Sequence, residues 1–279
     1  MRDTLSGSFA FPRWTFWPPG RIRVVNWNIE RGLRLEEVIK FLELQRADIL
    51  ILQEVDLYAR RTGFRNIAEE IAKRLRMNYA FGHEFQELTQ GRRDTPAYHG
   101  QATLSCWPIT NSRVIRFTRQ SNFWKPKWYL PRTEPFQQRL GGRIALVTEI
   151  EIGSRHLAVY NLHLESRADD RLKMLQLSET VKDAKECLDS HSVLLAGDLN
   201  VDLSRSHSSA VVLEHEGFHS AIALPAAHTT TPRGIFRHGR TIDWVYLAGP
   251  VESIASGVCY EVTASDHYPM WCELKLTAV

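Results

Sequence analysis

Apolar residues fall into short runs that end in polar side chains. Residues 193–196 are four consecutive apolar residues that lead directly into Gly197-Asp198-Leu199-Asn200, a pattern typical of a buried strand with a polar C-terminal end. Because side chains alternate along extended backbone, Asp198 and Asn200 are expected on the same side. Gly197 lacks a Cβ, so another group can approach the backbone there. The alternative is a strand end capped by an Asx turn.

The rest of the chain alternates between strand and helix patterns. Alternating or short apolar runs predict strands, and apolar residues three or four apart predict helices, one of them capped by Asn66. No linker separates two cores, so we expect a single domain over residues 21–279 behind an aromatic N-terminal arm, residues 1–20. The predicted strands cover residues 21–28, 49–52, 79–85, 102–105, 143–152, 157–161, 193–196, 241–247 and 270–276, and the helices residues 35–44, 66–75 and 171–188.

Composition changes this picture in one region. A hydrophobic fraction of 43% and a charged fraction of 24% are ordinary for a globular protein, and a net charge of +3 is too small to name a partner. From residue 86 to residue 140, however, the sequence contains nine basic residues and only three acidic ones. Residues 86–100 and 118–142 are also rich in Pro, Gly and aromatic residues, and insertions of this length are usually functional or mobile.

The cysteines and the hydropathy pattern suggest a compartment. The four cysteines are far apart and lack a Cys-x-x-Cys spacing, so neither a zinc site nor a redox motif is indicated. We expect reduced thiols, as is usual inside a cell. No apolar run approaches the length of a membrane span, and Pro12 and Arg13 interrupt the aromatic patch at the N-terminus, which therefore lacks the core of a signal peptide. The expected location is the cytoplasm.

Polar residues terminate most of the predicted strands, and their chemistry is consistent. Oxygen donors dominate, two histidines are present and thiols are absent, a mixture that favours Mg²⁺, with Mn²⁺ as a substitute, over a closed zinc site. The set comprises Asn28, Glu54, Asn161, His163, Asp198, Asn200, Asp243, Asp266 and His267.

These residues can supply what the hydrolysis of a phosphodiester requires: an aligned water, charge compensation and hydrogen-bond donors. Glu54 and Asp266 can anchor a cation with Asn28 nearby. Asp198 can align and deprotonate the water for in-line attack, held in place by Asn200. The remaining residues have the following expected roles: His163 and His267 donate hydrogen bonds to phosphate oxygens, and Asp243 pairs with one histidine.

The motifs that carry these residues also resemble a known family. Asn26-Trp27-Asn28, Gln53-Glu54, Asn161-Leu162-His163, Gly197-Asp198-Leu199-Asn200, Ile242-Asp243 and Ser265-Asp266-His267 occur in this order. The order is similar to that of the endonuclease/exonuclease/phosphatase superfamily, which includes apurinic endonucleases, pancreatic-type deoxyribonucleases and neutral sphingomyelinases. The similarity extends over residues 22–276.

The resemblance implies an α/β fold, a four-layer α/β/β/α sandwich of two mostly antiparallel or mixed sheets with the helices outside. It implies a Mg²⁺-dependent phosphoesterase whose site lies between the sheet edges. Carried over to this sequence, the metal residues are Asn28, Glu54 and Asp266, and the catalytic residues are His163, Asp198, Asn200, Asp243 and His267.

The chain departs from the family pattern in four places. Gln101 stands where many relatives have Asn, Trp244 follows Asp243 where Tyr or His is commoner, and Glu30 stands where apurinic endonucleases have Asp. The insertion over residues 86–142 matches no named subfamily. Arg143 could reach a phosphate, although a structural ion pair is the stronger interpretation.

Three interpretations of residues 123–129, Phe-Trp-Lys-Pro-Lys-Trp-Tyr, remain open. The aromatic residues and lysines suit base stacking on a single strand, a bilayer interface or a packed loop. The first hypothesis for the whole chain is therefore a phosphodiesterase acting on nucleic acid. The alternatives are a phospholipid or inositol-phosphate phosphoesterase and a non-catalytic module that binds a phosphate ligand.

Overall fold

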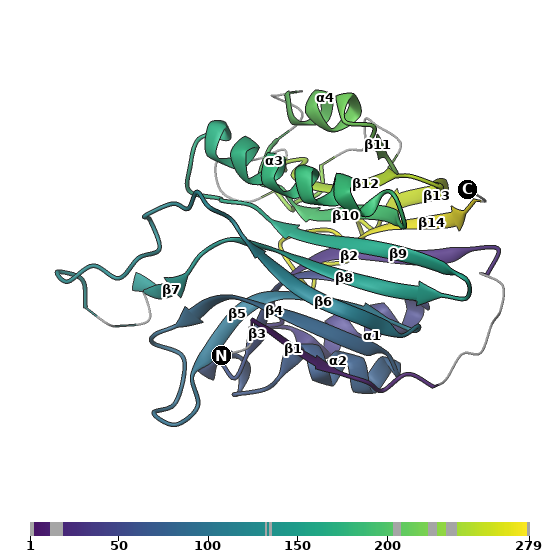
Figure 1. The fold of residues 1–279 in the computed structure, drawn as a ribbon. Coiled ribbons are helices and arrows are strands. Elements are labelled where there is room, and N and C mark those ends of the chain that lie inside the picture. Colours follow the sequence, from purple (N-terminus) through teal and green to yellow (C-terminus); the bar gives the residue numbers. More distant parts are fainter. Residues whose placement is uncertain are drawn as a thin grey trace.

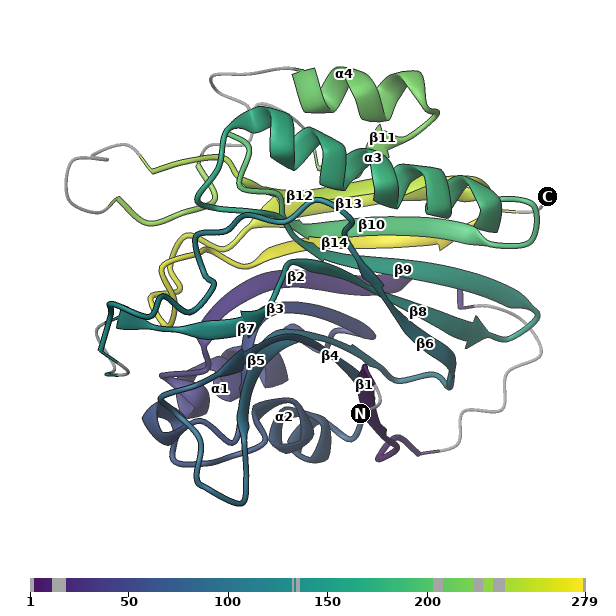
Figure 2. The same ribbon diagram turned by 60° about the vertical axis from the view of Figure 1, so that its left-hand side comes forward.

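The structure, a computed structural model, describes residues 3–11, 19–131, 133, 136–202, 208–222, 228–232 and 239–277. Two β-sheets lie face to face, and helices cover the outer face of each (Figures 1 and 2). This arrangement confirms the predicted four-layer α/β/β/α sandwich. Among the described residues, no helix is long and apolar enough to cross a membrane. The expectations for Trp14, Phe16 and Trp17 of the N-terminal arm concern residues outside the described ranges.

The first sheet has eight strands and is antiparallel except for the parallel pair β2–β3. Part of the predicted N-terminal arm forms its edge strand β1, and β7 pairs with β4 beside the main path. The order along the sheet is β1 (Thr4–Gly7), β4 (Asn78–Glu87), β5 (Ala97–Ser105), β3 (Ile49–Leu57), β2 (Ile22–Arg31), β14 (Met270–Leu276) and β13 (Val251–Val258), with β7 spanning Arg139–Gly141.

The second sheet has six strands and contains one parallel pair, β9–β10. Its order is β11 (His219–Ser220), β12 (Asp243–Ala248), β10 (Ser192–Asp198), β9 (Arg155–His163), β8 (Ile144–Ile152) and β6 (Ile109–Arg116). The helices are α1 (Leu35–Gln45) and α2 (Ile67–Leu75) beside the first sheet, α3 (Asp170–Cys187) and α4 (Ser208–His215) beside the second, and the short 3₁₀ helix η1 (Arg60–Thr62). The predicted cap is confirmed, since Asn66 accepts a hydrogen bond from the backbone N–H of Glu69.

Strand alternation divides the apolar residues into three layers. Along β3, Ile49 and Ile51 pack between the sheets, whereas Leu50 and Leu52 pack under α1 and α2. Along β10, the inward residues are Leu194 and Ala196, and Val193 and Leu195 pack under α3. Burial of these alternating apolar faces stabilises the sandwich by about 25 cal/mol for each Å² of apolar surface removed from water.

The inward face becomes polar toward one end of the sandwich. The inward positions that follow the apolar ones are occupied by Asn26, Asn28, Gln53, Asn161, His163 and Asp198, all of them buried. The Gln53 side-chain amide donates to Asn26 Oδ1 at 2.9 Å and to Asn161 Oδ1 at 2.8 Å. Asn161 in turn donates to the carbonyl of Ala102 at 3.0 Å. At the polar end of the sandwich, the two sheets are therefore joined by hydrogen bonds from side chains instead of by apolar contacts.

Gln101 forms a second link of the same kind. Its side chain is fully buried, donates to the carbonyl of Ile144 at 3.1 Å and accepts from the N–H of Leu146 at 3.3 Å. The residue that departs from the family pattern thus bonds the backbone of the opposite sheet.

Two β-bulges lie where the polar face begins. In β3 the residues Gln53 and Glu54 together oppose Gln101 of β5, and in β4 the residue Glu84 is extra between His83 and Phe85. Glu54 has φ 50°, the left-handed region that non-glycine residues rarely adopt. An extra residue re-aims side chains, and both bulges bring a carboxylate to this end of the sandwich.

Most predicted elements are confirmed, with three differences. The strand predicted over residues 49–52 continues through its bulge to Leu57, because the bulge interrupts the alternation without ending the ladder. Residues 97–100, predicted as insertion, belong to β5. The elements that the pattern missed are β1, β6, β7, β11, β13 and α4, which are short or have mixed burial.

Gly197 offers a test of the central strand pair. It has φ 146°, and a Cβ there would lie 1.9 Å from the backbone carbonyl oxygen of Leu162. We predict that Gly197→Ala lowers the free energy of unfolding by about 2 kcal/mol or more, because neither backbone can move without breaking the β9–β10 ladder. Chemical denaturation measures this effect. The control Gly20→Ala, where no atom lies within 4 Å, should change it by less than about 0.5 kcal/mol; equal effects of the two variants would contradict the packing argument.

Candidate active site

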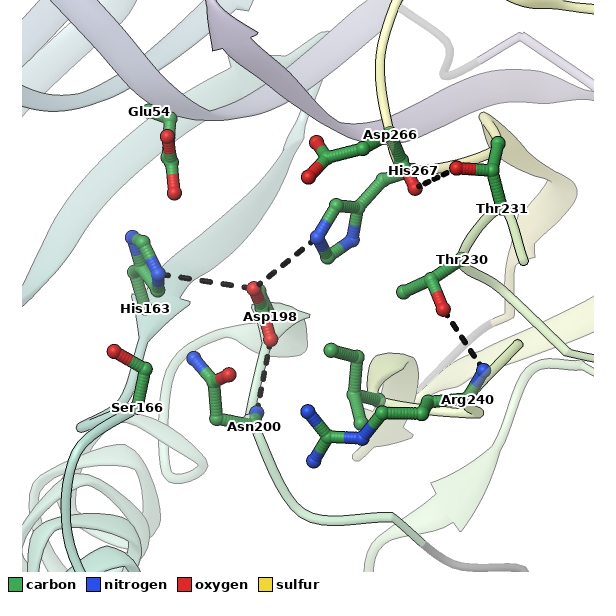
Figure 3. A pocket seen from close by; sticks show the side chains of 11 residues that line it. Glu54, His163, Ser166, Asp198, Asn200, Thr230, Thr231, Arg240, Asp266 and His267 are labelled. Carbon is green, nitrogen blue, oxygen red and sulfur yellow. Dashed lines mark hydrogen bonds and ion pairs between the residues drawn. The ribbon is translucent and has the colours of Figure 1, made fainter. Parts of the chain in front are cut away.

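The eight residues predicted as catalytic or metal-binding lie together at the polar end of the sandwich. Six of them line a cavity of about 220 Å³, together with Ser166, Thr230, Thr231, Arg240 and Ile242 (Figure 3). Asn28 and Asp243 lie behind the cavity wall and bond to residues that line it. The six that line the cavity are Glu54, His163, Asp198, Asn200, Asp266 and His267.

Asp198 occupies the middle of the group, at the end of β10. Its Oδ1 accepts the backbone N–H of Asn200 at 2.9 Å, and its Oδ2 accepts the amide of Asn28 at 3.3 Å. The Nε2 atoms of His163 and His267 lie 3.7 Å and 3.8 Å from Oδ2. Asn200 positions Asp198 through its main chain, while its side-chain amide donates to the carbonyl of Leu164. One carboxylate therefore faces two imidazoles across the cavity.

His267 is fixed on its far side by Asp243. Its Nδ1 lies 2.8 Å from Asp243 Oδ2, and its carbonyl accepts the indole N–H of Trp27 at 2.8 Å. Burial works against the charged imidazole, but the carboxylates of Asp243, Asp198 and Asp266 outweigh it and raise the pKa of His267 to about 10. At neutral pH this histidine is a cation whose Nε2–H faces the cavity.

The two groups that face His267 have pKa values shifted by burial. Burial raises the pKa of Asp198 to about 7, with Asp243 adding to the shift and the His267 cation opposing it. Burial and the nearby Arg143 guanidinium hold the pKa of His163 well below its usual range. The cavity thus holds a charged imidazole, a neutral imidazole and a carboxyl group that titrates near neutrality, which is the separation that acid–base chemistry requires.

Two of the three residues predicted to bind metal, Glu54 and Asp266, offer carboxylate oxygens at the cavity, and Asn28 lies behind its wall beside Asp198. Glu54 and Asp266 are partly exposed there, and Figure 3 shows both side chains above Asp198. Burial opposes the ionisation of Glu54, yet surrounding cations, Arg31 first among them, hold its pKa well below its usual range. Two carboxylates with an amide beside them fit a hard cation such as Mg²⁺, which keeps several waters.

Behind the cavity lies a layer of buried charges that sequence reasoning did not find. Glu84 accepts a hydrogen bond from Arg143 at 2.5 Å, and its second oxygen lies 3.7 Å from His163 Nδ1. This pair with Glu84 confirms the ion-pair interpretation of Arg143. Arg143 also donates a hydrogen bond to Ser166 at 3.2 Å. No sequence signal marked Glu84, because its inward direction depends on the bulge in β4.

His99 is the second residue that the sequence undervalued. It is buried on β5, where its Nδ1 lies 3.1 Å from Oδ1 of Asp56, its partner across the β3–β5 ladder. Asp56 is in turn held by two bonds of 2.7 Å from Arg61. His99, Gln101 and Thr103 alternate along β5 and therefore lie on the same inward face. This pattern can be recognised only when the extent and pairing of β5 are known.

Known proteins are similar to this chain in sequence pattern and in fold. The sequence model of the Endonuclease/Exonuclease/phosphatase family matches residues 25–267. No curated protein matches the chain.

Solved structures give the same fold. An endonuclease/exonuclease/phosphatase from Beutenbergia cavernae is 17% identical with a TM-score of 0.68, covering 93% of this chain and 72% of its own. The human Nocturnin catalytic domain with bound sulfate is 18% identical with a TM-score of 0.67, covering 99% of this chain and 98% of its own. Humanized D. rerio TDP2 is 17% identical with a TM-score of 0.65, covering 92% and 100%. At these identities the likeness concerns the fold.

The Asp243–His267 pair predicts a pH dependence. In metal-free protein kept in EDTA, the imidazole of His267 should stay protonated until the pH approaches about 10. Asp243→Asn should lower the pKa of His267 by about one unit or more, because the nearest carboxylate is lost. Titration of the ring carbon–proton signals by NMR measures both values, with the exposed Asp189→Asn as control.

The same shift links pH to stability. Because folding raises the pKa of His267 from 6.5, its stabilisation is complete below about pH 6.5 and is lost as the pH rises toward 10. Asp243→Asn should flatten this decline. If His267 titrates alike in wild type and in Asp243→Asn, the pairing does not set its charge.

Proposed function

The chain belongs to the endonuclease/exonuclease/phosphatase family, and from this premise we propose that it is a Mg²⁺-dependent phosphodiesterase in which a water molecule attacks the phosphorus in line. Members of the family are hydrolases that act on phosphoesters, and they generally use divalent metal ions. The observation that carries the proposal is the single cavity where Asp198 faces the Nε2 atoms of His163 and His267.

Each residue has a role that its contacts support. Asp198 Oδ2 accepts a proton from the water as the bond between water oxygen and phosphorus forms. The bond from phosphorus to the leaving oxygen breaks, and that oxygen takes a proton from solvent. The His267 cation donates its Nε2–H to a non-bridging phosphate oxygen, where negative charge builds. The neutral His163 donates one further hydrogen bond. When bound at Asn28, Glu54 and Asp266, Mg²⁺ would supply Lewis-acid stabilisation of that charge.

Asp198 suits the role of base because of its environment. A general base is most effective when its pKa lies near the working pH, and burial raises the pKa of Asp198 to about 7. The N–H of Asn200 and the amide of Asn28 hold the carboxylate in one orientation. A non-catalytic binding module would not need an oriented base of this kind.

The substrate that we favour is nucleic acid, on account of the segment over residues 118–142. In Figures 1 and 2 the described part of this segment, which ends with β7, extends away from the two sheets. Its Trp124 is anchored, since the indole N–H donates to the buried Glu165 at 3.1 Å, one residue before the cavity residue Ser166. Trp128 is 96% exposed and Tyr129 60%. Exposed aromatic rings with nearby lysines can stack the bases of a single strand and neutralise its phosphates.

The same exposure favours a phospholipid head group as the second candidate. Phe123, Phe136 and Leu140 are also exposed. The segment therefore presents more apolar side chains to solvent than the two rings, Trp128 and Tyr129, that base stacking would use. Trp, Tyr and Lys residues are enriched at bilayer interfaces. A packed loop, the third interpretation of residues 123–129, describes Trp124 but does not describe Trp128.

Replacement of the base or of the cationic imidazole tests the activity. Asp198→Asn and His267→Ala should each lower kcat about 10³-fold or more toward a responsive phosphodiester, because proton acceptance or charge compensation is lost. EDTA should abolish turnover and Mg²⁺ restore it. The assay is a panel of oligonucleotides, phospholipids and inositol phosphates, with the exposed His156→Ala as control. Near-normal activity in Asp198→Asn with an unchanged melting temperature would refute the assignment.

Salt and vesicles separate the two substrate classes. For a nucleic-acid enzyme, binding of a single-stranded oligonucleotide should weaken steeply with salt through counterion release. Trp128→Ala should weaken it by about tenfold through lost stacking. For a lipid enzyme, the wild type should sediment with anionic vesicles and Trp128→Ala should not. The control Phe11→Ala removes an exposed ring from the N-terminal arm instead.

A further inference from the structure

A histidine pair and a carboxylate converge where β3, β5 and β9 meet. One ligand atom from each of Glu54, His99 and His163 lies within 4.8 Å of the other two. We propose that these three residues bind a first-row transition-metal dication of the class of Zn²⁺ and Co²⁺. The site shares Glu54 with the proposed magnesium site but does not depend on whether the protein hydrolyses phosphodiesters.

His99 has the environment of a metal-binding histidine. Ligating histidines almost always donate their other ring N–H to a carboxylate or carbonyl, which fixes the tautomer and the ring. The Nδ1 of His99 lies 3.1 Å from Asp56 Oδ1, and Arg61 holds Asp56 through two bonds of 2.7 Å. Because Nδ1 is bonded to Asp56, Nε2 is the ring nitrogen of His99 that remains to bind a metal.

His163 provides an unpartnered buried nitrogen. Only 2% of this residue is exposed, and its Nδ1 has no hydrogen-bond partner among the described residues. Figure 3 shows the Glu54 carboxylate directed at this imidazole. A buried polar atom without a partner is costly and calls for an explanation such as an ion.

The buried charges around the site are compensated in pairs. Three acids each have an arginine partner at 2.5–2.8 Å, whereas Arg31 lies 3.7 Å from the partly exposed Glu54. The three close pairs are Asp56–Arg61, Glu87–Arg139 and Glu84–Arg143. The negative charge of Glu54 is therefore less closely paired than those of these three acids and can offset a dication.

The donor set selects the class of metal. Two imidazoles with one carboxylate suit Zn²⁺, Co²⁺, Mn²⁺ or Fe²⁺, whereas Mg²⁺ and Ca²⁺ prefer oxygen. The other cluster of the same kind, Asp198, Asp243 and His267, offers one imidazole and two carboxylates, so its donors are mostly oxygen.

Co²⁺ is the probe for the test. Metal-free full-length protein is titrated with Co²⁺, and binding is followed by visible absorption, which is stronger for four or five ligands that include imidazole than for six oxygens. We expect one tight equivalent with such a spectrum, displaced by Zn²⁺ but not by millimolar Mg²⁺. A wild type that binds Co²⁺ no more tightly than Mg²⁺, or with the weak spectrum of an all-oxygen site, would overturn the proposal.

Variants separate this site from the magnesium site. His99→Asn keeps an amide that can bond Asp56 but lacks the ligand, and should lower Co²⁺ affinity at least about tenfold. Asp266→Asn should weaken Mg²⁺ binding and leave Co²⁺ binding unchanged, and the exposed His156→Ala should change neither. Glu54→Gln, at a partly exposed position, repeats the test if His99→Asn alters the metal-free melting temperature.

The outcomes are distinguishable from those of the proposed function. Equal Co²⁺ affinity in wild type, His99→Asn and Glu54→Gln refutes the transition-metal site even if Mg²⁺-dependent hydrolysis is found. Loss of Co²⁺ binding in both variants upholds the site even if no phosphodiester in the panel is cleaved.

Discussion

A polar group buried between two sheets must find a partner there, and the site depends on this constraint. The inward strand positions are apolar at one end of the sandwich and polar at the other, where water does not reach most of them. The side-chain amides of Gln53, Asn161 and Gln101 donate hydrogen bonds to the opposite sheet. Each unpaired group would cost about 1–3 kcal/mol of stability. The hydrogen bonds between the sheets therefore hold the two sheets together next to the cavity.

The same enclosure gives the charged residues their chemistry. Asp243 has few alternatives to His267 as a partner, and the ion pair keeps that imidazole charged over the physiological pH range. Burial raises the pKa of Asp198 even though the His267 cation lies 3.8 Å away and opposes the shift. Asp198 and His267 are therefore close together but differ in protonation state at neutral pH. Asp198 can accept a proton while His267 remains a hydrogen-bond donor.

Side-chain parity predicted the strands and the polar residues that end them, whereas the four-layer sandwich and the roles of the site residues were implied by the family resemblance. Apolar runs such as residues 193–196 marked strands, and the polar residues after them marked one end of the sheets. At a β-bulge the alternation of inward and outward side chains is interrupted, so the direction of a side chain can no longer be predicted from its position in the strand. Gln53-Glu54 and Glu84 interrupt the alternation, so the extension of β3 to Leu57 and the inward carboxylate of Glu84 could not be read from the pattern. His99 and Asp56 face each other through strand pairing, which a single sequence does not record. Short elements such as β1 and β11 have too few residues for a period to register.

The proposed reaction brings a water molecule onto the phosphorus of a phosphodiester in this cavity. Hydrolysis in ¹⁸O-enriched water, followed by mass spectrometry of the phosphate-containing product, tests it most directly. A single turnover with wild-type protein and Mg²⁺ should place one ¹⁸O atom on the phosphate product and none on the released alcohol. Label on the alcohol, or a product formed without label, would contradict attack at phosphorus by water.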